Sequence, residues 1–182
     1  GRDRKWLSNA HPVLDGILGG WTVTMIFRYN SGNALEITPD VWYPGWSGIY
    51  GGGVYANVAP DADFSRQFNP ETFNPGAPAD PGNRYFDPES FSNPTDHQLG
   101  NGKMRYEELR GFGYASEDIG LMKSWQFSED VRLQFRAEFL NVFNRSHFSD
   151  PVTQIGARAR FGNVTEKTGI PRNVQLGLRL TW

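Results

Sequence analysis

The chain has 182 residues, and its 18 Lys and Arg residues against 20 Asp and Glu residues leave a formal net charge of −2. This balance excludes the basic field that attracts nucleic acid or an anionic membrane surface. The absence of Cys excludes disulfides, thiolate metal sites and a cysteine nucleophile, while 21 Gly, 12 Pro and an aromatic fraction of 14% favour strands joined by turns and long loops.

The first predicted element is a strand over about residues 20–30. One face carries apolar side chains and the other is mostly polar, which is typical of a strand between two environments. The apolar positions are Trp21, Val23, Met25, Phe27 and Tyr29. Helical periodicity is hard to find, and no stretch approaches the roughly 20 consecutive apolar residues of a transmembrane helix.

The second and third predicted strands cover about residues 114–126 and 131–143, and the polar residues 127–130 between them suit a tight hairpin turn. In the second strand, Ile119 and Leu121 share a face with Glu117 and Lys123. The third alternates clearly, with Val131, Leu133, Phe135, Ala137, Phe139 and Phe143 facing one way and Arg132, Gln134, Arg136 and Glu138 facing the other.

The fourth predicted strand covers residues 173–182. Val174, Leu176, Leu178, Leu180 and Trp182 occupy every second position. The segments 31–113 and 144–172 are long, and loops of this length are uncommon inside compact domains unless they have a function. Because the first is rich in Pro and Gly, we expect a surface excursion with only small strands of its own.

Alternating strands of this kind occur in a soluble β-sandwich or in an outer-membrane β-barrel. The apolar face packs on a second sheet in the sandwich and meets lipid in the barrel, where the polar face lines the lumen. Strand lengths of about 10–13 residues and aromatic residues near the strand ends favour the barrel. The pattern alone leaves both folds open.

The last residues resemble the signal by which assembly machinery recognises bacterial outer-membrane barrels. Its elements here are Gln175, Gly177, Leu180 and the terminal aromatic Trp182. A last strand is a free edge until a barrel closes, so it can be captured by strand addition, with alternate side chains giving selectivity. The alternative is the end of an edge strand in a soluble sheet.

Four segments extend this resemblance to a family, namely Tyr85–Phe91, Leu109–Tyr114, Val131–Asn144 and Arg172–Trp182. Together they are similar to the C-terminal end of TonB-dependent outer-membrane receptors, most closely the Oar-like type. Residues 14–32 resemble the preceding turn and strand. The resemblance implies an all-β fold, an antiparallel meander of about four long strands forming the C-terminal part of a transmembrane β-barrel, with one very long extracellular loop.

The same resemblance implies where each segment lies. The C-terminus would be periplasmic, so the turn 127–130 would be periplasmic and the loops 31–113 and 144–172 extracellular. It further implies the bacterial outer membrane as location, and the lipid bilayer, the barrel-assembly machinery, a plug domain and the TonB complex as partners. The chain begins at Gly1 rather than Met, and we expect all of residues 1–182 to be part of a longer barrel protein.

The residues predict a binding role rather than catalysis. No enzyme motif occurs, and no cofactor or metal is expected, because the His residues are scattered and the loop carboxylates Asp61, Asp63, Asp80 and Asp87 lack a compact ligand spacing. Aromatic residues gather in the first long loop, at Trp42, Tyr43, Trp46, Tyr50 and Tyr55. Such rings can stack on sugars or other ligands, or else form a small core or anchor the loop at the lipid boundary.

Two functions follow. The first is the C-terminal segment of a TonB-dependent transporter or receptor for nutrient uptake, with an oligosaccharide or a metal chelate as candidate substrate. The alternative is a secreted or surface β-sandwich module that binds carbohydrate or protein through the aromatic loop.

Overall fold

A computed structural model describes residues 11–41, 54–95 and 98–182. The chain divides into two compact units. The first, here called the sheet unit, comprises Gly1–Tyr29, Ala115–Arg145 and Ile170–Trp182. The second, here called the loop unit, comprises Asn30–Tyr114 and Ser146–Gly169.

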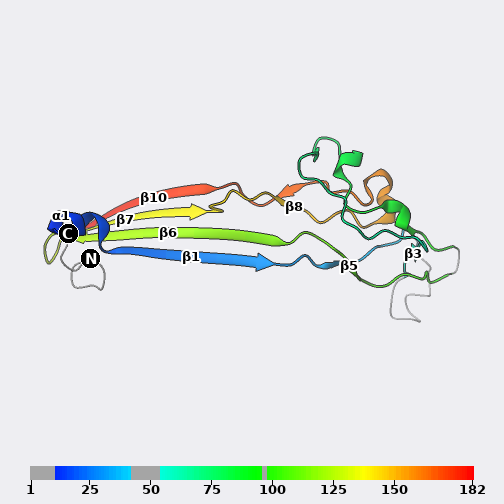
Figure 1. The fold of residues 1–182 in the computed structure, drawn as a ribbon, viewed down its shortest axis with the longest axis horizontal. Coiled ribbons are helices and arrows are strands. Elements are labelled where there is room, and N and C mark those ends of the chain that lie inside the picture. Colours follow the sequence, from blue (N-terminus) through cyan, green and yellow to red (C-terminus); the bar gives the residue numbers. More distant parts are fainter. Residues whose placement is uncertain (1–10, 42–53, 96–97) are drawn as a thin grey trace. The chain divides into compact units, whose positions relative to one another are not determined.

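The sheet unit is built on one sheet of four strands in the order β1-β6-β7-β10, which lie side by side in Figure 1. The strands are β1 (Trp21–Asn30), β6 (Tyr114–Gln126), β7 (Arg132–Leu140) and β10 (Asn173–Thr181). The register places Ala137 of β7 opposite Leu121 of β6 and Leu176 of β10. The predicted antiparallel meander of four long strands is therefore confirmed.

One strand boundary differs from the prediction by more than one residue, because β7 ends at Leu140 and not at residue 143. Asn141 adopts a φ of 50°, which takes the backbone out of the extended region. Its side chain accepts a hydrogen bond from the backbone N of Arg145 at 2.8 Å and donates one to the carbonyl of Ile170 at 3.0 Å. The prediction that Phe143 continues the alternating apolar face is wrong, because Phe143 lies in this turn.

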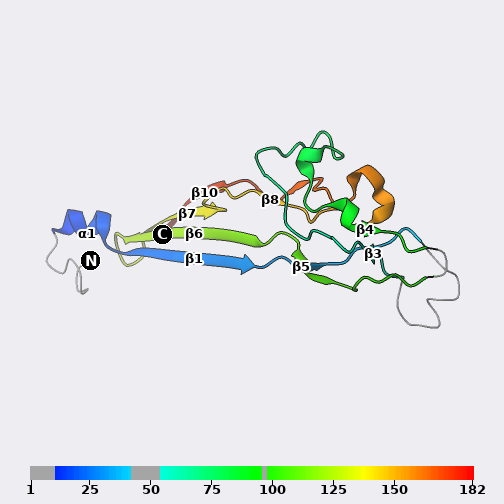
Figure 2. The same ribbon diagram turned by 45° about the vertical axis from the view of Figure 1, so that its right-hand side comes forward.

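The sheet unit also contains a helix that the sequence analysis did not predict, α1 (Pro12–Leu18). Figure 2 shows it directly before β1. Pro12 at the first helical position and Gly20 just beyond the end, with a φ of 71°, are typical helix boundary signals. The seven residues are too few for a helical apolar period to be visible in the sequence. Among the described residues, no helix is long and apolar enough to cross a membrane.

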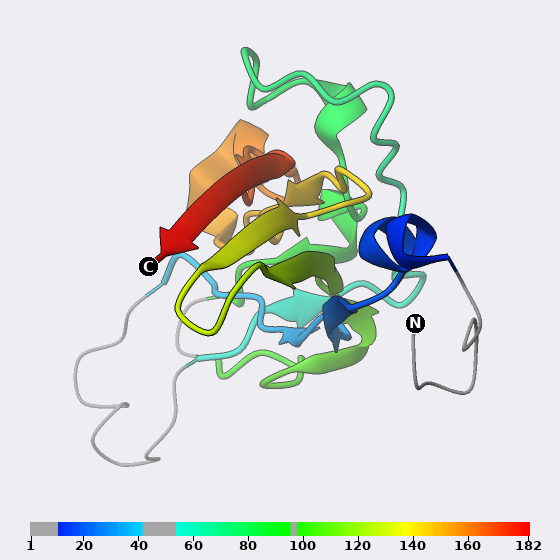
Figure 3. The same ribbon diagram turned by 90° about the vertical axis from the view of Figure 1, so that its left-hand side faces the viewer.

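The connection between β6 and β7 is a tight turn, in which the backbone N of Phe127 donates to the carbonyl of Val131 at 2.9 Å. β6 and β7 are antiparallel, and the turn between them lies at the same end of the sheet as α1 and the C-terminus (Figure 1). Figure 3 looks at the sheet from this end.

The loop unit consists of short elements. Three two-stranded sheets pair β2 (Ala34–Leu35) with β5 (Tyr106–Arg110), β3 (Asn57–Val58) with β4 (Phe91–Ser92), and β8 (His147–Phe148) with β9 (Lys167–Thr168). The described residues of the unit also form three 3-10 helices, η1 (Pro81–Asn83), η2 (Pro88–Ser90) and η3 (Ile155–Arg160).

A buried aromatic core holds these short elements together. Its members are Leu35, Ile37, Ala56, Phe68, Tyr85, Phe86, Phe91, Tyr106, Leu109, Phe161 and Val164. Phe68 stacks edge-on against Phe148 with ring centroids 5.0 Å apart, and Phe86 does the same with Phe161 at 5.4 Å. Residues from both long segments thus share one core. The expectation of small strands holds, and they belong to a packed unit with its own core.

Buried amides hold the irregular backbone around this core. Asn83 is buried and donates to the carbonyls of Asn74 and Ala77 at 2.8 and 3.0 Å. Asn163 is also buried and donates to the carbonyls of Pro78 and Asp80 at 3.1 and 3.2 Å. Because buried polar side chains need hydrogen-bond partners, these bonds satisfy both amides, and they hold the irregular backbone where no long strands do so.

Candidate functional site

The sheet has two chemically distinct faces, since directly paired residues of neighbouring strands share a face. The apolar face is defined by Trp21, Val23, Met25, Phe27, Tyr29, Ile119, Leu121, Leu133, Phe135, Ala137, Phe139, Val174, Leu176, Leu178 and Leu180. The polar face is defined by Thr22, Thr24, Arg28, Asp118, Ser124, Arg132, Gln134, Arg136, Glu138, Gln175 and Arg179.

Both faces are open along the outer strands of the sheet. Every residue of β1 and of β10 is exposed, and the side chain of Leu176 on the apolar face is 71% exposed. A sandwich would cover the apolar face with a second sheet. A wall that meets lipid leaves it open, so the exposure of both strands favours the barrel over the sandwich.

The polar face carries paired charges. Arg28 of β1 forms an ion pair with Asp118 of β6, and Arg136 pairs with Glu138 along β7. Arg132 donates to the hydroxyl of Ser124 at 3.2 Å. Such mutually satisfied charges suit a water-facing surface and indicate a structural role more than a ligand site.

The apolar face also contains a buried acid, Glu117, whose side chain is 1% exposed. It accepts hydrogen bonds from the hydroxyl of Tyr29 at 2.6 Å and from Arg145 Nε at 2.8 Å. A second bond from the Arg145 guanidinium reaches the other carboxylate oxygen at 2.9 Å. Because a buried charge must be paired, this cluster fastens β1, β6 and the turn after β7 to one another.

The four residues of the predicted assembly signal lie on or directly after β10, an edge strand of the four-stranded sheet. Gln175 and Gly177 pair with Glu138 and Arg136 of β7, and Leu180 pairs with Leu133. Trp182 follows the strand and is 86% exposed. An edge strand with an exposed terminal aromatic is accessible to strand addition, and recognition by assembly machinery stays a prediction.

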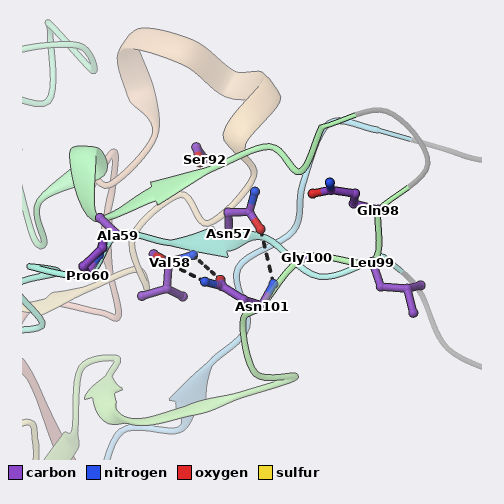
Figure 4. A pocket seen from close by; sticks show the side chains of 9 residues that line it. All are labelled: Asn57, Val58, Ala59, Pro60, Ser92, Gln98, Leu99, Gly100 and Asn101. Carbon is purple, nitrogen blue, oxygen red and sulfur yellow. Dashed lines mark hydrogen bonds between the residues drawn. The ribbon is translucent and has the colours of Figure 1, made fainter.

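A polar pocket in the loop unit is the candidate ligand site (Figure 4). Its volume is about 630 Å³, and its lining residues are Asn57, Val58, Ala59, Pro60, Ser92, Gln98, Leu99, Gly100 and Asn101. The side-chain oxygen of Asn57 accepts from the backbone N of Asn101 at 3.2 Å, and that of Asn101 accepts from the backbone N of Val58 at 2.7 Å. These bonds hold together the two chain segments that form the pocket.

Gly100 shapes the same pocket. Its φ is 78°, and a Cβ at this position would collide with the backbone carbonyl of Tyr55. The backbone N of Tyr55 in turn donates to the carbonyl of Leu99 at 2.7 Å. Only glycine fits this close approach of two chain segments. The pocket was not predicted from the sequence, where the turn-forming Gly100–Asn101 pair is a local signal of it.

The predicted aromatic ligand contacts fall mainly outside the described residues. This holds for Trp42, Tyr43, Trp46 and Tyr50, whereas Tyr55 is described and half-buried beside the pocket. A ligand-binding role for these five residues stays a prediction.

Three of the four loop carboxylates, Asp63, Asp80 and Asp87, have structural roles. Asp80 and Asp87 cap the 3-10 helices η1 and η2 by accepting from the backbone N of Gly82 and Glu89. Hydrogen bonds from the backbone N and hydroxyl of Ser65 lower the pKa of Asp63. In the part of the chain that the structure describes, no group of three or more His, Cys, Asp or Glu side chains is placed to hold a metal ion.

Comparison with known protein families identifies the family of the chain. Residues 1–175 match the family model of the outer membrane beta barrel domain. The chain therefore belongs to this family, and its location is the bacterial outer membrane. Neither the comparison with curated proteins nor that with solved structures found a match. The predicted barrel class and location are thus confirmed, while the TonB-dependent and Oar-like assignments are finer than the family.

Proposed function

We propose that this chain is the C-terminal barrel segment of a TonB-dependent outer-membrane transporter or receptor for nutrient uptake. The observation that carries the proposal is the two-faced sheet, whose exposed apolar face suits lipid and whose paired charges suit a water-filled or plugged lumen. A barrel that encloses a plug needs such a polar inner wall.

The lengths of the connections support an orientation. A short turn joins β6 to β7, whereas the whole loop unit is formed by the connections from β1 to β6 and from β7 to β10. Outer-membrane barrels have short periplasmic turns and longer extracellular loops. In the proposed orientation the β6–β7 turn and the C-terminus are therefore periplasmic and the loop unit is extracellular.

The polar pocket supports a substrate class. The amide of Gln98, the side-chain nitrogen of Asn57 and the hydroxyl of Ser92 offer donors and acceptors to a hydroxyl-rich ligand. An oligosaccharide fits this chemistry better than the other candidate, a metal chelate. We further propose that Trp42 and Trp46, which lie outside the described residues, stack on the same ligand.

The remaining partners are part of the same proposal. The lipid bilayer contacts the apolar face, the barrel-assembly machinery captures β10, and a plug domain and the TonB complex supply gating and energy. This scheme assigns no enzymatic role to the chain.

Uptake in the source bacterium tests the proposal. We expect cells that carry the intact gene to accumulate a labelled oligosaccharide or ferric chelate from a panel, and cells that lack the gene not to do so. We expect depletion of TonB, or dissipation of the proton gradient, to abolish the same uptake. The matched control is a small solute that enters through passive porins, whose uptake depends on neither the gene nor TonB.

Two results would contradict the proposal. Gene-dependent uptake that persists without TonB would indicate a passive channel. An unchanged uptake of every panel member after gene deletion would remove the transport role altogether.

A further inference from the structure

Three side chains of the sheet bind the C-terminal end of helix α1. Lys123 Nζ donates to the carbonyls of Ile17 at 3.0 Å and of Gly19 at 2.5 Å. Trp125 Nε1 donates to the carbonyl of Gly16 at 2.9 Å, and Trp21 Nε1 donates to that of Ile17 at 2.9 Å. The last carbonyls of a helix have no partner within the helix, so these three donors supply what the helix lacks.

Lys123 explains why the helix is held at this place. It lies on the apolar face, yet only 2% of it is exposed. Its ammonium group lies 5.2 Å from the ring centre of Trp21 and 5.4 Å from that of Trp125, where ring faces attract a cation. The negative end of the helix dipole adds to this attraction. Without α1, the ammonium group of Lys123 would be exposed on the apolar face. The helix therefore covers this charge.

While its carbonyl end is bound, α1 presents apolar side chains to the outside. Val13, Ile17 and Leu18 are all exposed, with Ile17 at 59%. Val13 and Ile17 are four residues apart and so lie on the same side of the helix. Trp21 and Val23, at the start of the strand that follows the helix, are exposed as well.

We propose that α1 is a membrane-surface anchor whose Val13, Ile17 and Leu18 insert into a phospholipid leaflet at the end of the sheet where the C-terminus lies. The inference rests on the proposed contact of the apolar face with lipid. Trp and Lys side chains gather at the boundary between headgroups and acyl chains, and a helix that lies there buries its apolar side by about 5–10 Å. In the proposed orientation this is the periplasmic leaflet.

The absence of Cys from the chain makes a direct depth measurement practical. A nitroxide spin label is attached to single-cysteine variants of the protein assembled in outer membranes, with any cysteine outside this chain replaced. The variants are Ile17→Cys on α1, Met25→Cys within the apolar face and Thr22→Cys on the polar face. Collision rates with oxygen, which concentrates in lipid, and with a water-soluble nickel chelate give the depth of each label.

We expect the label at position 25 to collide mainly with oxygen and that at position 22 mainly with nickel. We expect the label at position 17 to lie about 5–10 Å below the phosphate level, shallower than the label at position 25. Should position 17 give the same collision ratio as position 22 while position 25 reports lipid, α1 is not an anchor although the lipid face stands. Should position 25 itself report water, the proposed lipid contact of the apolar face fails.

A second variant tests the role of Lys123. We expect Lys123→Gln to increase the mobility of the label at position 17 and to remove its defined depth, because the helix loses its charged partner. The label at position 25 should not change. An unchanged spectrum at position 17 would mean that Lys123 does not hold α1 on the sheet.

Discussion

The sheet unit and the loop unit use the same kinds of apolar residues in opposite ways. In the loop unit Phe86 is 0% exposed and sits in a cluster of edge-on rings. In the sheet unit Leu176 and Leu178 stand exposed on the strand surface. A chain that folds in water alone would bury both sets. The difference fits the proposed setting of the two units, with water around the loop unit and lipid against the apolar face of the sheet.

The largest effect should come from the end of the sheet. We expect Trp182→Ala to abolish membrane assembly, because the terminal aromatic is part of the proposed recognition of the edge strand. Phe127→Ala is the matched control, since Phe127 is an exposed aromatic residue at the same end of the sheet. The readout is the amount of protein in the outer-membrane fraction that shows heat-modifiable migration. Normal amounts of the Trp182→Ala protein would show that Trp182 is not an assembly signal.

A core substitution sharpens the contrast between the units. We expect Phe86→Ala to lower the free energy of unfolding of the loop unit by about 3–5 kcal/mol, because it opens a cavity among packed rings. Met104→Ala, at an exposed position of the same unit, should change it by less than about 0.5 kcal/mol. Urea-dependent hydrogen exchange of loop-unit amides measures both. Equal effects of the two substitutions would mean that the aromatic cluster is not the core of the unit.

The smallest effect concerns pH. Burial raises the pKa of the phenols of Tyr85 and Tyr106 above the ordinary value of 10.0. The folded loop unit therefore favours the neutral phenols. Their contribution to stability is complete below the ordinary pKa and is lost as the pH rises through the raised pKa. We expect the loop unit to lose stability above about pH 10.

The double variant Tyr85→Phe, Tyr106→Phe is the control for this loss. It cannot ionise at these positions, so its urea midpoint should depend less on pH in the alkaline range than that of the unaltered protein. Identical alkaline slopes for the two proteins would assign the loss to other groups.

The sequence predicted the sheet unit well because its strands obey a simple rule. β10 alternates without interruption, and β1 does so except at Ile26, since each face meets one environment along its length. The rule failed where a side chain overrides the backbone pattern. Asn141 ends β7 by bonding to Arg145 and Ile170, and the distance of 29 residues between Asn141 and Ile170 hides such a contact from any local pattern.

The loop unit was harder to predict for a related reason. Phe68, Tyr85, Phe86 and Phe91 have no common spacing, because the backbone around them is irregular and follows hydrogen bonds of Asn83 and Asn163 instead of a ladder. The pocket likewise depends on Asn57 and Asn101, which are 44 residues apart. Composition pointed to long loops, but only the long-range contacts reveal that these loops share one core.

The shared core of the loop unit has a consequence for the order of folding. The backbone N of Tyr85 donates to the carbonyl of Gly162, and that of Val164 donates to the carbonyl of Asn83, so the first segment of the unit is incomplete without the second. Between them in the chain lies the whole β6–β7 hairpin. Contacts of such long sequence separation form slowly. During export the rings of the first segment therefore remain exposed until the last third of the chain has been exported. A periplasmic chaperone would protect these rings from aggregation in that interval.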